Sequence, residues 1–221
     1  MSSPQVAEFA REQMVSQQIR AWDVLDETIL DLFRRLPRET FVPAAYRDVA
    51  YADLPIPLAH GQNMLQPSVV GRLLQAVAVR HGERVLEVGT GSGFVSACLG
   101  TLGAQVRSLE IHEDLAAGAR AALAATGIGQ VEVVHADAFA SVSGGAQYDV
   151  VVLTGSLPVH DARFESLLRP GGRLFAIVGD APAMDARLVT LDGSGARRSE
   201  SLFETVVAPL IGARRTDPFR F

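Results

Sequence analysis

The fold is decided by the stretch Val85-Leu86-Glu87-Val88-Gly89-Thr90-Gly91-Ser92-Gly93. It begins as an apolar run, passes into a turn with three glycines and leads into a helical pattern over 94–102. In open α/β sheets, ligands bind beyond the carboxyl ends of strands, near the switch in strand order. Glycines in such a turn let a ligand approach the backbone closely. The stretch favours a ligand-binding α/β domain, although a tight turn without a ligand remains an alternative.

Short apolar runs alternate with helical stretches after this turn. Strands that are apolar on both faces and separated by helices are typical of a parallel sheet covered on each side. The last two runs flank Asp192-Gly193-Ser194-Gly195, which predicts a hairpin. The fold class is therefore α/β, a doubly wound, mostly parallel sheet with a C-terminal antiparallel hairpin. The predicted strands are 84–88, 105–109, 131–135, 149–153, 173–178, 187–191 and 202–208, and the predicted helices are 94–102, 113–126 and 160–168.

The first 80 residues have a different pattern. A helix is expected from the Ser2-Ser3-Pro4 start signal to about Arg20, and another over 26–36 with Asp26 as its N-cap. A proline-rich irregular stretch follows, and then a helix over 68–80. We expect 1–80 to form a helical extension with a substrate-side loop. It would pack on an α/β domain over 81–221, so that the chain is one compact unit.

Composition excludes several classes of protein. All 20 basic side chains are arginine, and the absence of lysine excludes Schiff-base chemistry and a P-loop. The single Cys98 excludes an internal disulfide, and the five histidines show no metal-ligand spacing, so no metal is expected. The net charge of −5 argues against nucleic-acid and membrane partners. Residues 1–10 lack a signal-peptide pattern, and we expect a cytoplasmic protein.

A nicotinamide dinucleotide is the first ligand to consider for the glycine turn. Its motif needs a small residue five positions after the first glycine, and Phe94 stands there. Glu87, just before the turn, is a poor neighbour for a pyrophosphate and a good one for a cation. An oxidoreductase is therefore the weaker alternative.

Acidic residues follow the next two predicted strands. Glu110 lies 21 residues after Gly89, where a carboxylate can accept both ribose hydroxyls, and Asp137 with Ala138 can read an adenine edge. An exposed strand-end Glu110 and a helix-capping Asp137 are the alternatives. With Glu87, these carboxylates describe a site for a nucleoside and a cation without phosphate. S-adenosyl-L-methionine fits that description.

The sequence resembles the protein-L-isoaspartate O-methyltransferase family over nearly the whole chain. The glycine turn is shared with many methyltransferases, whereas the N-terminal segments and the pair Gly61-Gln62 and Gln66-Pro67 are more specific. The other matching segments are 14–20, 24–26, 37–43, 51–53, 54–56, 169–174 and 207–210. The resemblance implies a Rossmann-like methyltransferase fold.

That resemblance implies methyl transfer from S-adenosyl-L-methionine, which leaves S-adenosyl-L-homocysteine, to the free carboxylate of isoaspartyl residues. Damaged peptides or proteins would be the substrates, and the protein a monomer or weak dimer. Ester collapse to a succinimide and hydrolysis would then return some normal aspartate. The implied cofactor residues are Glu87, Gly89, Thr90, Gly91, Ser92 and Gly93 near the methionine part, Glu110 at the ribose, Ile111 on the adenine, and Asp137 and Ala138 at its edge.

The acceptor side departs from the family pattern. Leu65 stands where the family has its active-site serine, and Asn63 where it has a threonine. Thr154 begins a loop that also differs, so Asn63, Leu65 and Thr154 are the candidate catalytic residues. A leucine has no hydroxyl to orient a carboxylate. A methyltransferase with a different, unknown acceptor is therefore the first alternative, and a module that only binds the cofactor is another.

Overall fold

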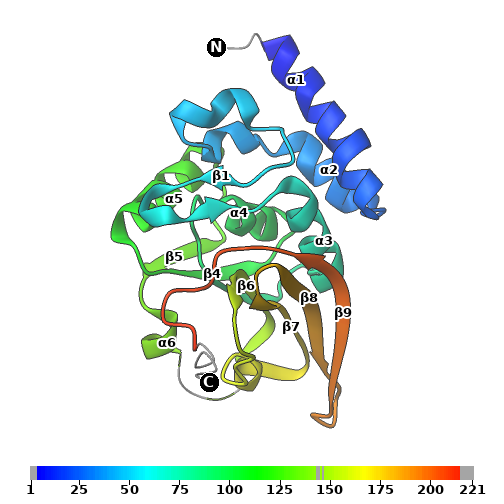
Figure 1. Ribbon diagram of the computed structural model, residues 1–221, viewed down its shortest axis with the longest axis vertical. Coiled ribbons are helices and arrows are strands. Elements are labelled where there is room, and N and C mark those ends of the chain that lie inside the picture. Colours follow the sequence, from blue (N-terminus) through cyan, green and yellow to red (C-terminus); the bar gives the residue numbers. More distant parts are fainter. Residues whose placement is uncertain (1–3, 143–144, 146, 215–221) are drawn as a thin grey trace, which may run out of the picture.

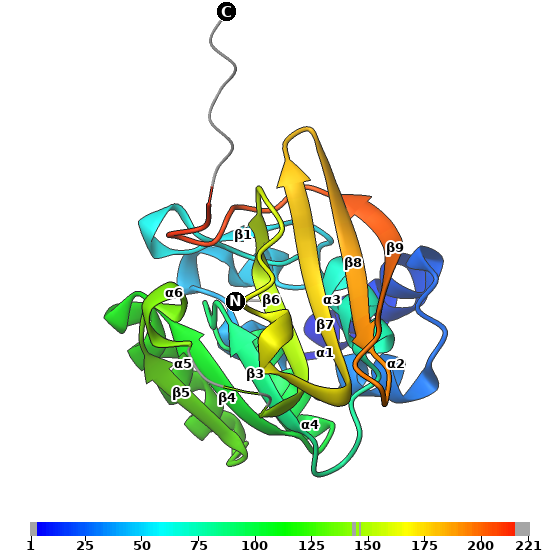
Figure 2. The same ribbon diagram turned by 90° about the horizontal axis from the view of Figure 1, so that it is seen from below.

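The chain forms one seven-stranded sheet, in the order β5-β4-β3-β6-β7-β8-β9. The computed structural model describes residues 4–142, 145 and 147–214. The strands are β3 (Arg84–Val88), β4 (Gln105–Glu110), β5 (Val131–His135), β6 (Tyr148–Leu157), β7 (Leu168–Asp180), β8 (Ala183–Leu191) and β9 (Arg197–Thr205). The first five strands in this order, β5, β4, β3, β6 and β7, pair in parallel. Strand β8 pairs antiparallel with both β7 and β9. Figure 2 shows the twist of this sheet from β5 to β9. The predicted fold class is confirmed.

Helices precede the sheet and connect its first strands. The α-helices are α1 (Pro4–Gln13), α2 (Glu27–Arg35), α3 (Pro67–Val77), α4 (Phe94–Thr101), α5 (Glu113–Thr126) and α6 (Ala138–Ser141). The chain continues from α1 as a π-helix over Met14–Ile19 and a 3-10 helix over Arg20–Trp22. The N-cap prediction for Asp26 is confirmed, since its side chain accepts from the Thr28 amide at 2.8 Å. Ser2 and Ser3 lie outside the described residues.

Further short elements lie before the sheet and in the β6–β7 connection. They are the 3-10 helices Arg38–Phe41, Ala44–Val49, Ala59–Gly61 and Glu165–Leu167, and the two-stranded sheet of β1 (Ile56–Pro57) and β2 (Asn63–Met64). In Figure 1, β1 lies between the N-terminal helices and the main sheet. The proline-rich stretch thus forms a layer above the carboxyl ends of the central strands.

The two faces of the sheet are covered unequally. Alternate residues of β3 point to opposite faces, so Val85 joins the apolar cluster shared with α2 to α5, and Leu86 joins the other cluster. The second cluster is closed by α6 and by Phe164 and Leu167 of the β6–β7 connection. Burial on both faces explains why these strands read as apolar runs.

The structure corrects three details of the predicted elements. The predicted helix 160–168 is wrong, because only Glu165–Leu167 form a 3-10 helix. Here the Asp161 side chain accepts from the Arg163 amide at 3.0 Å, a local turn that competes with helix. The expected loop after the fourth strand is also wrong, since 154–157 continue β6 with a shift in register after Val152. The last strand is Arg197–Thr205 rather than 202–208, because Leu191 pairs with Arg197 directly after the turn.

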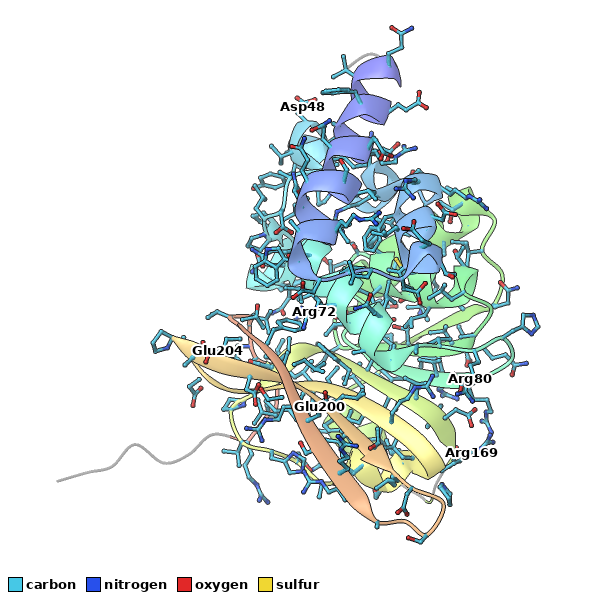
Figure 3. The ribbon with its side chains drawn as sticks, turned by 90° about the vertical axis from the view of Figure 1, so that its right-hand side faces the viewer. Asp48, Arg72, Arg80, Arg169, Glu200 and Glu204 are labelled. Atoms are coloured by element: carbon cyan, nitrogen blue, oxygen red, sulfur yellow. The ribbon has the colours of Figure 1, made fainter. Side chains whose placement is uncertain are left out.

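The N-terminal part and the sheet share one core. Met14 and Leu30 belong to the same apolar cluster as Val150 and Ala186. Arg72 of α3, labelled in Figure 3, donates to the Leu202 carbonyl of β9 at 3.0 Å. These contacts support the proposal that 1–80 and 81–221 form one unit. In the part of the chain described, no helix is long and apolar enough to cross a bilayer.

Candidate active site

A cavity of about 450 Å³ lies at the carboxyl ends of the central strands. The chain runs outward from β3 to β5 and returns to β6 beside β3, so the strand order switches here. Its wall comes from the segments after β3, β4, β5 and within β6, together with residues before α3 and after β9. Among the predicted site residues, those lining it are Asn63, Leu65, Gly89, Gly91, Glu110, Ile111, Asp137, Ala138 and Thr154.

The glycine turn needs its glycines for two reasons. Gly89, Gly91 and Gly93 have φ angles of 95°, 54° and 85°, a region that side chains rarely adopt. A Cβ on Gly89 would also lie 2.4 Å from Thr154 Oγ1. Thr154 donates to the Gly89 carbonyl at 2.5 Å and reaches the Val88 carbonyl at 2.9 Å. The hydroxyl hydrogen of Thr154, a candidate catalytic residue, is therefore donated to the glycine turn.

Glu110 lies at the tip of β4 and is only 4% exposed. One carboxylate oxygen accepts from the Gly91 amide at 2.7 Å and the other from the His112 amide at 3.0 Å. Each oxygen keeps a further lone pair for a ligand. Glu110 thus ties the glycine turn to the start of the next loop, and it is not the exposed strand-end residue that the sequence left open.

Asp137 follows β5, the neighbour of β4 in the sheet. Its side chain accepts from the Phe139 amide at 2.8 Å and caps α6, while the residue also lines the cavity. Capping and a place at the cavity therefore occur together, because the cap needs one carboxylate oxygen only. Ala138 is the first residue of α6 and lines the same wall.

Glu87 and Gly93 lie outside the cavity wall that the described residues form. Glu87 is fully buried and accepts from Ser108 Oγ at 2.6 Å and from Ser96 Oγ. Burial raises its pKa to about 7. Gly93 serves as the N-cap of α4. Neither of these two predicted cofactor residues borders the cavity, because β3 turns the Glu87 side chain toward α4 and Gly93 ends the turn where α4 begins.

A smaller space of about 40 Å³ adjoins the cavity, and Asn63, Leu65, Gly89, Gly91 and Thr154 line both. Thr90 and Ser92 line only this smaller space, on the side of the glycine turn. Arg38 closes it from the N-terminal part and is 1% exposed. Sequence reasoning placed Arg38 in a family segment but gave it no role, since an arginine in a polar-looking stretch is ordinarily exposed.

The segment after β9 also lines the cavity. The sequence places 207–210 among the segments that resemble the family but assigns them no role. Residues 206–211 run from β9 toward α6, as the red ribbon in Figure 1 shows. The Ser156 amide donates to the Ala208 carbonyl and the Leu210 amide to the Ser156 carbonyl, both at 2.9 Å. Val206 and Ile211 are 57% and 43% exposed at this rim. Apolar side chains that are exposed beside a cavity indicate a ligand-contacting segment, and this signal is visible only in the structure.

A histidine contact joins the two sides of the cavity mouth. His60 has a φ of 58°, and its Nε2 lies 2.8 Å from an Asp114 carboxylate oxygen at the start of α5. Its ring stacks on His112 with centroids 3.9 Å apart. The hydrogen bond from His60 lowers the pKa of Asp114. Loop 59–61 is thereby held against the segment that carries Ile111.

Among the described residues, no group of three or more His, Cys, Asp and Glu is placed to hold a metal ion. Phe94 packs against Phe33 and Phe41, with ring centroids 6.0 and 5.7 Å away. The position where a dinucleotide site needs a small residue is thus part of the core.

Comparisons with known proteins show the family of this chain. A family model for protein-L-isoaspartate(D-aspartate) O-methyltransferase matches residues 9–215. Protein-L-isoaspartate O-methyltransferase 1 of Rhodopseudomonas palustris (strain HaA2) is 41% identical over 204 residues, covering 91% of this chain and 83% of that protein. Protein-L-isoaspartate O-methyltransferase of Koribacter versatilis (strain Ellin345) is 36% identical over 221 residues, covering 99% of each.

A solved structure has the same fold. It is the crystal structure of a protein from Plasmodium falciparum described as a protein-L-isoaspartate O-methyltransferase, in complex with S-adenosyl-L-homocysteine. Its TM-score is 0.76 at 17% identity, and the match covers 92% of this chain and 97% of that one. At this identity the likeness shows the fold alone. The family match spans most of the sequence, and two relatives exceed 30% identity over 83% and 99% of their lengths. The chain therefore belongs to the protein-L-isoaspartate(D-aspartate) O-methyltransferase family.

Proposed function

We propose that this protein is an S-adenosyl-L-methionine-dependent methyltransferase that esterifies the carboxylate of L-isoaspartyl residues in damaged proteins. The observation that carries the proposal is the pair of carboxylates, Glu110 and Asp137, which line one cavity from the tips of neighbouring strands. The family membership supplies the acceptor. The cytoplasmic location, the monomer or weak dimer and the lack of nucleic-acid and membrane partners stay predictions from the sequence.

The residues present fit an adenosyl cofactor. The free lone pairs of Glu110 suit ribose hydroxyls, while Asp137 and the backbone of Ala138 offer an acceptor and a donor to an adenine edge. Ile111 supplies an apolar surface beside them. Gly91 keeps the wall open, because a Cβ there would come within 3.3 Å of Leu58. When bound, the cofactor supplies an electrophilic methyl group on a cationic sulfur.

The chain's work in the reaction is orientation. An acceptor carboxyl group with a pKa of about 4 is ionised at neutral pH, so no residue has to act as a base. The walls must hold its oxygen within about 3–3.5 Å of the methyl carbon and in line with the sulfur. Asn63 can donate to the acceptor from its amide, and Leu65 and residues 206–211 can exclude water.

A different acceptor is the second candidate, and the position of Leu65 favours it. Leu65 lines the cavity with a side chain that neither donates nor accepts a hydrogen bond. The Thr154 hydroxyl is engaged by the glycine turn. Of the three predicted catalytic residues, Asn63 is therefore the one whose side chain has a polar group that no described residue engages.

The acceptor is tested with methyl-labelled cofactor and two peptides that differ only in isoaspartate against normal aspartate. We expect a base-labile methyl ester on the isoaspartyl peptide alone. Leu65→Ser is assayed beside the natural chain. Labelling by Leu65→Ser but not by the natural chain would support a changed acceptor, and no labelling by either would reject isoaspartate as the substrate.

Cofactor binding is tested separately by calorimetry with S-adenosyl-L-homocysteine. Glu110→Ala is expected to weaken binding by about tenfold or more, because hydrogen bonds to a charged group contribute about 1.5–3 kcal/mol. Glu132→Ala, an exposed carboxylate on β5, is the matched control and should leave the affinity unchanged. Equal affinities for both variants would contradict the assigned ribose contact.

A further inference from the structure

Arg38 is a buried cation, and one nitrogen of its guanidinium has no hydrogen-bond partner among the described residues. It opens the 3-10 helix Arg38–Phe41, and its guanidinium lies 4.6 Å from the centre of the Phe94 ring. Nε donates to the Ala50 carbonyl at 2.9 Å and Nη2 to the Leu65 carbonyl at 3.0 Å. Nη1 is buried and has no hydrogen-bond partner among the residues that the structure describes. Such an orphaned donor calls for an explanation.

The positive charge of Arg38 also has no directly paired carboxylate among the described residues. Within the described part of the chain, no carboxylate lies within 4 Å of the Arg38 guanidinium. Burial lowers the pKa of Arg38 to about 10, so the side chain is still protonated at neutral pH. Buried charges in proteins are ordinarily paired, because an isolated one costs several kcal/mol. Asp53 acts on Arg38 only from beyond that distance, so no anion pairs directly with its guanidinium among the described residues.

The space beside Arg38 is small and opens toward the cavity. It measures about 40 Å³, and its wall includes Thr90 and Ser92 of the glycine turn and Leu65 of the opposite loop. A single water needs about 10–15 Å³ of such space, so the space admits a group of a few atoms but no ring. An anion reaching Arg38 must be compact and must extend from a ligand in the larger cavity.

We propose that Arg38 binds the α-carboxylate of the methionine part of the cofactor through Nη1. This inference rests on the proposed function and adds a residue to its cofactor site. The carboxylate is compact, and the space that it would enter is walled by the glycine turn. All three guanidinium nitrogens of Arg38 then have a hydrogen-bond partner, while Nη2 still donates to the Leu65 carbonyl.

The chemistry favours the carboxylate of the cofactor over that of the acceptor. Methyl transfer consumes the negative charge of the acceptor, so a cation bound there would stabilise the reactants more than the transition state. The α-carboxylate keeps its charge throughout the reaction. An arginine bound to it holds the cofactor without opposing the chemical step.

The test is a calorimetric comparison of two ligands, S-adenosyl-L-homocysteine and its decarboxylated analogue, which keeps the amine and lacks only the carboxylate. Arg38→Met is expected to weaken binding of the first by about 10- to 100-fold. Binding of the analogue should change by less than about threefold, since it never met Nη1. Arg120→Met is the matched control, because Arg120 also bonds a backbone carbonyl, Val133 at 3.1 Å, and lies on α5 outside the cavity wall.

A readout on the natural chain guards against misfolding of Arg38→Met. With arginine labelled by nitrogen-15, the NMR signal of the Arg38 side chain should shift when S-adenosyl-L-homocysteine is added. It should not shift when the decarboxylated analogue is added. Arg38→Lys, which keeps the charge, identifies the resonance by its disappearance and should recover part of the lost affinity.

The outcomes separate this inference from the proposed function. If neither ligand binds the natural chain, the adenosyl site itself is refuted. If Arg38→Met weakens both ligands equally, or the resonance moves equally with both, Arg38 only shapes the loop and the inference is overturned. If Arg38→Met leaves the affinities for both ligands unchanged but raises KM for the isoaspartyl peptide, Arg38 binds the acceptor carboxylate, and its assignment to the cofactor is wrong.

Discussion

Glu87 shows how one buried side chain couples the glycine turn to the core. It faces Ser108 across the β3–β4 pair, and Ser96 approaches from α4. Its other oxygen has no partner among the described residues. Desolvation outweighs the two serine hydroxyls, which is why the pKa rises from 4.5 to about 7. The carboxyl group thus titrates near neutral pH in the folded protein.

Replacing Glu87 by Gln should remove a pH dependence of stability. The folded state holds the Glu87 proton more tightly than the unfolded state. The stabilisation that this proton gives the folded state is therefore complete below pH 4.5 and is lost as pH rises through about 7. Between pH 5 and pH 8 the natural chain should lose on the order of 2–3 kcal/mol relative to Glu87→Gln. Urea unfolding at both pH values measures this, and a constant difference between the two proteins would contradict it.

Gly89 and Gly61 allow backbone strain and steric collision to be separated. Both have positive φ, 95° and 69°, but a Cβ on Gly89 meets Thr154 Oγ1 and one on Gly61 meets nothing within 4 Å. Gly89→Ala should therefore destabilise the protein by about 1–3 kcal/mol more than Gly61→Ala. It should also weaken cofactor binding, because the turn has to move. Chemical unfolding and calorimetry check both points, and equal losses would show that strain alone matters.

At the scale of elements, helix α5 contains a glycine that lowers the stability of the helix and that no contact requires. Gly118 lies inside this helix, is exposed, has no positive φ, and would place a Cβ in open space. Glycine costs a helix interior about 1 kcal/mol relative to alanine. Gly118→Ala should therefore stabilise the protein by about that amount and raise Tm by about 2–4 °C.

The matched control lies at the end of the same helix. Gly127 caps α5 with a φ of 72°, which alanine adopts at a cost of about 1–2 kcal/mol. Gly127→Ala should lower Tm where Gly118→Ala raises it, with methyl-transfer rates unchanged in both. Thermal unfolding followed by circular dichroism decides, and a fall in Tm for Gly118→Ala would count against the open-space assignment.

Elements were predicted well where burial set a period and poorly where side chains closed local turns. The strands 84–88 and 131–135 agree with the structure residue for residue. The first is buried from Val85 to Val88, whereas the second is an edge strand of the parallel part, with Val133 as its buried residue. The segment 160–168 has apolar residues at helical spacing, but Asp161 diverts its backbone. The extension of β6 through 154–157 follows from pairing with β7 and with Pro209, partners that no local pattern reveals.

At the scale of the molecule, the single Trp22 reports on the cooperation between the N-terminal part and the sheet. Its ring meets Phe203 of β9 edge-on at 6.4 Å, and its carbonyl accepts from Arg72 at 3.1 Å. Because both parts share one apolar cluster, we expect them to unfold together. Trp fluorescence and far-ultraviolet circular dichroism should give the same urea midpoint. Separate midpoints would mean that 1–80 unfolds as a unit of its own.

The sequence by itself determined the sheet, the glycine turn and the acidic residue at the end of β4, because these depend on local periodicity and on fixed spacing along the chain. Only the tertiary structure decided that Glu87 does not border the cavity, that Arg38 is buried beside Leu65, and that residues 206–211 border the cavity. Each of these depends on contacts between segments far apart in the chain. Such contacts form where burial of apolar surface on two faces of the sheet brings the segments together, and no single segment encodes its partner.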